Sequence, residues 1–277
     1  MFSGAAAYYD RYRPPYPTAL LRDLRREAAA GGTRLVDWGC GTGELTLPLG
    51  PSFDEVIAVD IDADMIAAAR AKADQLGQSH VRWIVGSAES LALPDDSVDL
   101  IVAGSSFHWM DRGLLAGRAY RALTAGGAIG VAGGGSSVWD VTCEWHEVAV
   151  ASMKRWLGEQ RRAGSGTYAV AGRHEDNLRS AGFRLEHRRY RVAYRWSADS
   201  IVGYLYSTSF AGPAVLGDRR QSFEAELRAG LARLSPDDSF DEVLDYHLLI
   251  GRRSAPGPGR PPSTAGCRSG RSSVFGS

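Results

Sequence analysis

The amino-acid sequence predicts an α/β fold, in which a mostly parallel sheet carries helices on both faces. Short apolar runs alternate with segments of helical pattern through the first half of the 277 residues. A glycine-rich turn follows the first apolar run, and an acidic residue ends the second. A chain of this length can bury a full α/β core.

The turn after the first apolar run is the strongest local signal in the sequence. The run at 34–38 leads into Gly39, Gly41 and Gly43, and Glu44 follows. Three glycines at alternate positions let a turn bend tightly and bring its backbone close to a ligand. The spacing differs from the G-x-G-x-x-G pattern of dinucleotide sites, which argues against a nicotinamide-dependent dehydrogenase.

The second apolar run, 55–60, ends at Asp60, which lies 17 residues after Gly43. A carboxylate at the end of this strand can accept hydrogen bonds from two ribose hydroxyls. The alternative role for Asp60 is the N-cap of the following helix. Because the glycine turn precedes it, we favour the ribose role.

The other elements follow from periodicity and from helix-ending residues. Further strands are expected at 81–85, 98–103, 128–132, 183–196 and 240–252. Helices are expected at 18–30, 44–49, 63–76, 113–123, 138–158, 175–181, 198–209 and 213–234. Pro14, Pro15 and Pro17 predict a non-helical, extended N-terminal segment.

Three stretches resemble the small-molecule, type 11-like family of class I S-adenosylmethionine (SAM) methyltransferases. They are V-D-W-G-C-G-T-G at 36–43, Y-D-R-Y-R-P-P-Y-P at 9–17 and S-F-H-W-M-D at 106–111. The resemblance covers residues 8 to about 251. It implies a Rossmann-like fold with a seven-stranded, mostly parallel sheet that ends in an antiparallel pair, and a helical lid.

The resemblance also implies SAM as cofactor, with S-adenosylhomocysteine as its product. Arg13 would pair with the cofactor carboxylate, and Met65 would pack on the adenine. Ser87 stands where the family has an aspartate that binds the adenine amine, so an ordinary turn at 86–89 is an equal alternative. The implied cofactor residues are Tyr8, Tyr12, Arg13, Asp37, Gly39, Cys40, Gly41, Gly43, Asp60, Ile61, Met65, Ser87, Ala88, Glu89 and Ser105.

His108 is the candidate general base, because of its position after the fourth strand and its intrinsic pKa. The alternative is a histidine that holds its loop or lines the cofactor pocket. His108, Trp109, Tyr204 and Tyr206 are candidates for acceptor binding. The alternative for Trp109 is core packing, and the alternative for the two tyrosines is packing of the lid on the sheet. The remaining histidines and the three cysteines show no metal-ligand spacing, so we expect no metal.

A formal net charge of zero argues against a nucleic-acid-binding surface. The sequence contains no apolar run long enough for a membrane span and no signal-peptide pattern. We therefore expect a cytoplasmic protein that acts on a small molecule, and a homo-oligomer is compatible with the sequence. The competing functions are a nucleic-acid methyltransferase and a non-catalytic, SAM-binding partner or regulatory protein.

The expected organisation has four parts. Residues 1–17 form a flap over the cofactor, and 18–135 form the SAM-binding core. Residues 136–253 supply lid helices and the last two strands. Residues 254–277, rich in proline, glycine, serine and arginine, are expected to be a disordered tail, because they have little to bury.

Overall fold

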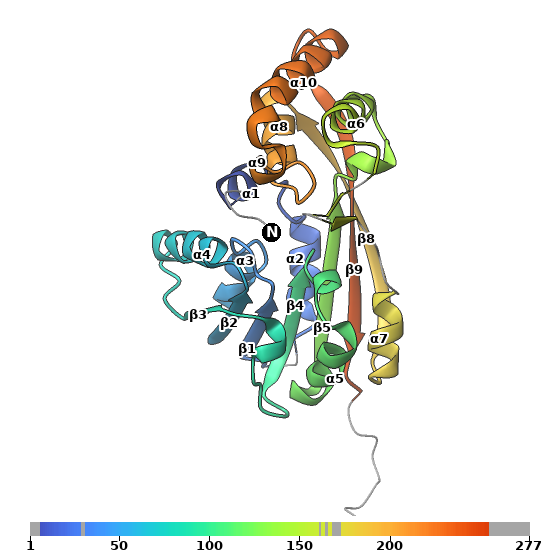
Figure 1. Cartoon of the computed structure of the whole chain (residues 1–277). Helices are drawn as coiled ribbons and strands as arrows, with labels where there is room; N and C mark the ends of the chain where they lie inside the picture. The colour runs from blue at the N-terminus through green and yellow to red at the C-terminus, as the bar shows by residue number, and fades with distance from the viewer. Residues whose placement is uncertain (1–5, 29–30, 161, 164–165, 168–172, 255–277) are drawn as a thin grey trace, which may run out of the picture.

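One seven-stranded sheet organises the computed structural model, which describes residues 6–28, 31–160, 162–163, 166–167 and 173–254 (Figure 1). The strand order is β3-β2-β1-β4-β5-β9-β8. The first five are parallel, and β9 runs antiparallel to both of its neighbours. The strands are β1 (Arg34–Trp38), β2 (Glu55–Asp60), β3 (Val81–Val85), β4 (Val98–Gly104), β5 (Leu123–Gly135), β8 (Arg184–Trp196) and β9 (Phe240–Arg252).

Helices connect these strands and build a cap at one end of the sheet. The α-helices are α1 (Ala6–Tyr12), α2 (Thr18–Arg26), α3 (Thr46–Leu49), α4 (Ala63–Gln75), α5 (Arg112–Ala122), α6 (Glu144–Leu157), α7 (His174–Ser180), α8 (Ala198–Tyr206), α9 (Pro213–Leu216) and α10 (Arg220–Leu234). The 3-10 helices are η1 (Gly50–Ser52), η2 (Ala88–Ser90), η3 (Phe107–Trp109), η4 (Val138–Asp140) and η5 (Gly217–Arg219). A separate two-stranded hairpin pairs β6 (Arg162–Ala163) with β7 (Gly166–Thr167).

Successive residues of each buried strand point to opposite faces of the sheet, and different helices cover the two faces. Leu35 of β1 packs in an apolar cluster with Leu24 of α2 and with residues of α3 and α4. Its neighbour Val36 packs in a second cluster with Leu115 of α5 and Leu178 of α7. The predicted α/β fold with helices on both faces is thereby confirmed.

The long strands β8 and β9 continue past the end of β5 and carry the cap. Their pairing runs from Arg184↔Arg252 to Trp196↔Phe240. The cap consists of α6, α8, α9 and α10 and lies beyond the carboxyl ends of the parallel strands (Figure 1). Its buried aromatic residues, including Trp145 and Phe223, belong to the same apolar cluster as Leu35. Within the described ranges, every helix is too short or too polar to cross a lipid bilayer.

The N-terminal segment differs from its expected extended form. Residues Ala6–Tyr12 form α1, so the expectation of a non-helical segment is wrong for them. Proline restricts itself and the residue before it, and the first proline is Pro14. Residues upstream of Arg13 are therefore free to be helical. Residues 1–5 of the expected flap and 255–277 of the expected tail lie outside the described residues.

Two expected helices of the cap begin later or are interrupted. The helix expected at 138–158 begins only at Glu144, because Val141 takes a left-handed conformation with φ of 48° after η4. The helix expected at 213–234 is broken at Gly217, which has φ of 54°. The expected α2 ends at Arg26, and the expected fifth strand is longer at both ends. Local left-handed residues are the physical reason for the two breaks.

Candidate active site

The glycine turn after β1 is held against the ends of β2 and β4. The backbone N–H groups of Gly39 and Cys40 both donate to the carbonyl of Val59, at 2.8 and 3.1 Å. Gly39 has φ of 66°, and a Cβ on it would lie 2.6 Å from Cβ of Ser106. Only glycine fits this position, because both the backbone conformation and the close approach of Ser106 exclude a side chain. The turn is thus fixed by the sheet before any ligand binds.

A cavity of about 400 Å³ opens beside this turn. Its lining residues come from the carboxyl ends of β1 to β4, from the segments that follow them, including the start of α4, and from α1. We call it the cofactor cavity. They are Tyr9, Gly39, Gly41, Val59, Asp60, Ile61, Asp62, Met65, Gly86, Ser87, Ala88, Glu89, Ser105, Ser106, Trp109 and Met110. Ile61 is 78% exposed and Trp109 44% exposed, so the walls leave apolar surface uncovered. This is the lining expected of a site for a flat, partly apolar ligand.

Asp60 is oriented by two backbone donors from opposite sides. Gly41 N–H donates to Oδ2 and Asp62 N–H donates to Oδ1, both at 2.9 Å. A carboxylate has about four lone-pair sites, so these two bonds leave capacity for a further donor. Asp62, not Asp60, caps α4 by accepting from Asp64 and Met65. The alternative role of Asp60 as a helix N-cap is therefore wrong.

The segment at 86–89 forms another wall of the cofactor cavity. Ser87 Oγ accepts from the N–H of Ser90 at 3.2 Å. Glu89 Oε1 accepts from the N–H of Asp111 at 2.9 Å, so it also fixes the end of the η3 loop. Both side chains line the cavity while making these bonds. Their assignment to the adenine amine stays a prediction.

A second cavity, of about 200 Å³, lies between the core and the cap, and we call it the acceptor cavity. Its lining residues are Tyr9, Arg13, Ser105, His108, Trp109, Ser136, Ser137, Val138, Trp139, Tyr204, Thr208, Ser209 and Phe210. Three of them, Tyr9, Ser105 and Trp109, also line the cofactor cavity. The two cavities therefore meet at these side chains.

Ser105, at this junction, holds a strained backbone conformation. Its φ is 50°, the left-handed region that residues other than glycine seldom adopt. Its N–H donates to the carbonyl of Ala132 at 2.8 Å, and its Oγ lies 3.2 Å from the hydroxyl of Tyr16. Strain of this kind persists where the surroundings over-determine it, and it gathers at functional sites.

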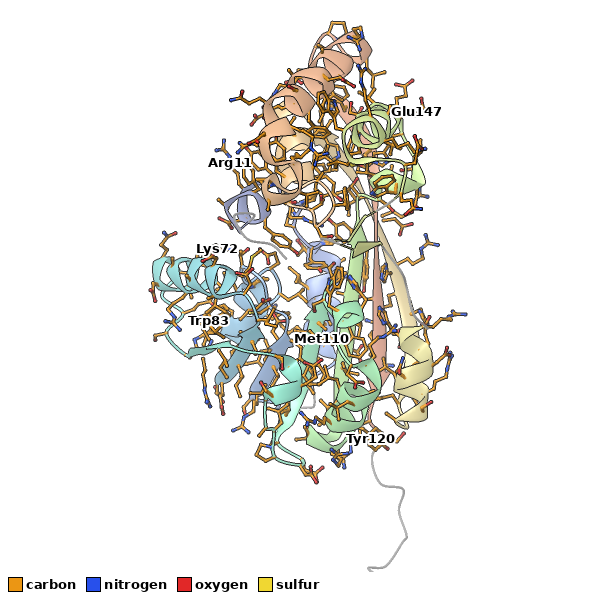
Figure 2. The ribbon with its side chains drawn as sticks, in the orientation of Figure 1. Arg11, Lys72, Trp83, Met110, Tyr120 and Glu147 are labelled. Carbon is orange, nitrogen blue, oxygen red and sulfur yellow. The ribbon has the colours of Figure 1, made fainter. Side chains whose placement is uncertain are left out.

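Helix α1 joins the core to the cap across both cavities. Asp10 pairs with Lys72 of α4 at 2.6 Å, and Lys72 lies on the side of α4 towards α1 in Figure 2. On the other side, Tyr12 donates to Asp199 of α8 at 3.2 Å. Tyr8 accepts from Arg220 of α10 at 2.9 Å. Tyr9, on the same helix, faces inward to both cavities.

The structure gathers most of the expected cofactor residues but not all of them. Gly39, Gly41, Asp60, Ile61, Met65, Ser87, Ala88, Glu89 and Ser105 line the cofactor cavity. Gly43 packs against Leu47, and the Cys40 side chain is 4% exposed among apolar neighbours, so neither lines it. Asp37 is 1% exposed and accepts from Thr46 Oγ1 at 2.6 Å. Arg13 lines the acceptor cavity instead.

Three tyrosines lie elsewhere than expected. Tyr8 and Tyr12 face the cap rather than the cofactor cavity, because their rings stack on each other and Tyr8 packs edge-on against Tyr206. Tyr206 is 1% exposed and donates to Glu224 at 2.8 Å, which turns it away from the acceptor cavity. The expectation that Tyr206 contacts the acceptor is therefore corrected. Tyr204, His108 and Trp109 do line that cavity, and their roles stay predictions.

Several lining residues were missed by sequence reasoning. Tyr9 is the central one, and helical geometry explains the miss: once 6–12 is a helix, Tyr9 cannot share a face with both Tyr8 and Tyr12. The acceptor cavity also contains Ser136, Trp139 and Phe210. Ser136 and Trp139 come from the segment after β5 and Phe210 from the loop after α8, and the two segments meet only in the fold.

Half-buried Cys143 and buried His146 and Glu242 form a polar cluster outside both cavities, with ligand-type atoms within 4.8 Å of one another. His146 Nδ1 accepts from the N–H of Thr142 at 3.2 Å, and its Nε2 lies 3.3 Å from a Glu242 carboxylate oxygen. Burial raises the pKa of the Cys143 thiol to about 11, which keeps it protonated. We assign this cluster to the joining of α6 and β9.

Sequence comparisons agree with this site. A family model described as a methyltransferase domain matches residues 36–131. An uncharacterized methyltransferase of Mycobacterium tuberculosis is 34% identical over 130 residues, which is 47% of this chain and 50% of that protein. The chain thus spans about half the length of that relative.

Two further comparisons extend along nearly the whole chain. An uncharacterized methyltransferase of Schizosaccharomyces pombe is 30% identical over 254 residues, which covers 90% of this chain and 93% of that protein. A solved structure from Anaeromyxobacter dehalogenans, described as a candidate type II methyltransferase, superposes with a TM-score of 0.59 at 25% identity. It covers 88% of this chain and 99% of its own.

A clash at Gly203 tests the docking of α1 on α8. A Cβ at Gly203 would lie 2.3 Å from Cγ of Tyr12, so Gly203→Ala must displace the Tyr12 ring. Because Tyr12 ends α1, we expect the helix and Tyr9 to shift with it. Alanine favours a helix interior by about 0.5–1 kcal/mol over glycine, so α8 itself should not weaken. We expect roughly tenfold weaker binding of S-adenosylhomocysteine by titration calorimetry, about 1.4 kcal/mol.

The matched control for this prediction is the double variant with Tyr12→Ala. It should bind like Tyr12→Ala alone, since removal of the ring removes the clash and makes the two effects non-additive. Additive losses would show that Gly203 acts on the cavity by another route.

The buried carboxyl of Asp37 predicts a pH-dependent stability. Burial raises the pKa of Asp37 to about 7, because desolvation outweighs the hydrogen bond from Thr46. Below the ordinary carboxyl pKa of about 3.9, Asp37 is protonated in both states and its ionisation does not change the free energy of unfolding. As pH rises from there to about 7, only the unfolded chain loses the proton, so the free energy of unfolding falls. Between pH 5 and pH 8 the wild type should lose about 2–3 kcal/mol more than Asp37→Asn does in urea denaturation. An equal pH-dependent change in the free energy of unfolding of both proteins would contradict the raised pKa of Asp37.

Proposed function

Because the chain belongs to the family of SAM-dependent methyltransferases, we propose that it transfers the methyl group of SAM to a small molecule held in the acceptor cavity. The observation that carries the proposal is the junction of the two cavities at Tyr9, Ser105 and Trp109. Methyl transfer is an in-line displacement, so donor and acceptor must meet at one point without water between them. A junction of this kind supplies that geometry.

The lining of the cofactor cavity fits SAM chemically. Asp60 offers free lone pairs for the ribose hydroxyls, and the uncovered apolar surface of Ile61 suits the adenine. Asp60, Asp62 and Glu89 make the lining acidic, which suits a cationic ligand. Bound SAM would supply a methyl group already activated by its sulfonium.

The protein's own part is to orient the acceptor, exclude water and receive a proton where the acceptor loses one. Tyr9 is not suited to receive it, because burial raises the pKa of its hydroxyl to about 12 and keeps it protonated. His108 lines the acceptor cavity with its ring 4.7 Å from that of Trp109, and we assign it as the general base. With SAM bound, the acceptor atom would form its new bond to the methyl carbon as the carbon–sulfur bond breaks.

The size and charge of the site favour a small acceptor over a nucleic acid. The acceptor cavity is about 200 Å³, which suits a small molecule, and the net charge of the chain is zero. Incubation with SAM and pooled small metabolites should give a product heavier by one methylene and stoichiometric S-adenosylhomocysteine, both seen by mass spectrometry. Cofactor binding without turnover on any pool would favour the non-catalytic, SAM-binding alternative.

The ribose assignment of Asp60 has a separate test. Asp60→Ala should weaken binding of S-adenosylhomocysteine by roughly 1–3 kcal/mol, because the ribose hydroxyls lose their acceptor. The 2′-deoxy analogue should bind more weakly than S-adenosylhomocysteine to the wild type and equally to Asp60→Ala. Asp54→Asn, on the exposed loop before β2, is the control and should behave as wild type. A folded Asp60→Ala protein of unchanged affinity would refute the assignment.

A further inference from the structure

Arg13 places a positive charge in the wall of the acceptor cavity. Its Nε donates to Ser207 Oγ at 3.0 Å, and its Nη2 donates to the Ser207 carbonyl at 3.4 Å. The rings of Tyr9 and Tyr204 flank the guanidinium, with centroids 4.8 and 5.2 Å from Cζ. These contacts use two of its five N–H donors and supply no negative charge.

Among the residues that the structure describes, no carboxylate lies within ion-pair distance of Arg13. Glu44 borders a smaller cavity next to Arg13, but its carboxylate already has other partners. It lies 3.6 Å from Lys72 Nζ and accepts from Thr42. Arg13 retains N–H donors beyond these two bonds, and a bound anion would give them a charged partner.

The two cavities have opposite electrostatic character. The cofactor cavity is lined by Asp60, Asp62 and Glu89, and none of its described lining residues is basic. In the acceptor cavity Arg13 is the one described side chain with a permanent charge. Complementary charges select partners at a site, so the acidic cavity suits the cationic cofactor and the basic one an anionic ligand.

The other side chains that line the acceptor cavity indicate the chemistry of the rest of such a ligand. Trp139 and Phe210 meet edge to face with centroids 5.8 Å apart and form an apolar wall with Trp109. We propose that the acceptor is a small carboxylate with an apolar or aromatic body, whose anionic group pairs with Arg13. This inference rests on the function proposed above and gives it a substrate class.

The proposal changes the role that the resemblance implied for Arg13, which was to bind the cofactor carboxylate. The smaller cavity lies between Arg13 and Glu44, so a cofactor carboxylate there would face the Glu44 carboxylate. In the acceptor cavity Arg13 faces serine, threonine and aromatic side chains, and none of the described lining residues is acidic. A planar guanidinium binds a carboxylate through two parallel hydrogen bonds.

Calorimetry on the protein saturated with S-adenosylhomocysteine tests the proposal. The probes are 3-phenylpropanoate and its neutral isostere 3-phenylpropanamide. The wild type should bind the acid at least about tenfold more tightly than the amide, and Arg13→Gln should abolish the difference. Arg11→Gln is the matched control, because Arg11 is exposed on α1, is labelled in Figure 2 and lines neither cavity. It should keep the preference.

Affinity for S-adenosylhomocysteine itself separates the two roles of Arg13. Under the proposal, Arg13→Gln changes it less than about threefold, whereas a cofactor anchor would lose about tenfold or more. That larger loss would overturn the proposal, and so would equal or undetectable binding of both probes by the wild type. A wild type that does not bind S-adenosylhomocysteine would instead refute the proposed function.

Discussion

The carboxylate of Asp60 is the interaction on which the cofactor cavity depends. It accepts hydrogen bonds from Gly41 on the turn after β1 and from Asp62 at the start of α4. These bonds tie two neighbouring βα junctions together at the carboxyl ends of the strands, where open α/β sheets bind their ligands. Backbone donors orient the carboxylate in advance, so a ligand need not supply the free energy of ordering it.

The acceptor cavity depends on a different constraint, the docking of α1. The helix is seven residues long and makes polar contacts with α4, α8 and α10. A helix this short is not stable alone in water, so its tertiary contacts must hold it in place. Tyr9 and Arg13 reach the cavities only because those contacts fix the helix and the chain that follows it. The N-terminal segment is therefore part of the site and not an appendage of the sheet.

The two cavities carry charges of opposite sign, although the net charge of the chain is zero. The chain as a whole has 32 basic and 32 acidic residues and is formally neutral. Locally, three carboxylates border one cavity and a guanidinium borders the other. Inside a protein the effective dielectric constant is well below that of water, so these local charges act more strongly than exposed ones. Such an arrangement can hold two ligands of opposite charge close together.

The sequence by itself determined the sheet, the glycine turn and the position of Asp60. These features depend on local sequence: apolar periodicity marks buried strands, and glycines at alternate positions allow a tight turn with left-handed residues. Residues just after parallel strands necessarily meet at one edge, so Gly39, Asp60, Ser87 and Ser105 could be placed together in advance.

Only the tertiary structure decided the acceptor cavity. Its wall combines Arg13, the segment that holds Ser136 and Trp139, and Phe210, three parts of the chain that are far apart in the sequence. Whether a tyrosine faces a ligand or the cap depends on its position around the helix axis. In α1, Tyr9 points into the cavities, whereas Tyr8 and Tyr12, which were expected there, point to the cap. Tyr206 likewise points away from the acceptor cavity, because its hydroxyl donates to Glu224 of α10, 18 residues further along the chain. Local sequence fixes which elements form, whereas side-chain direction at an interface is set by the elements that pack there.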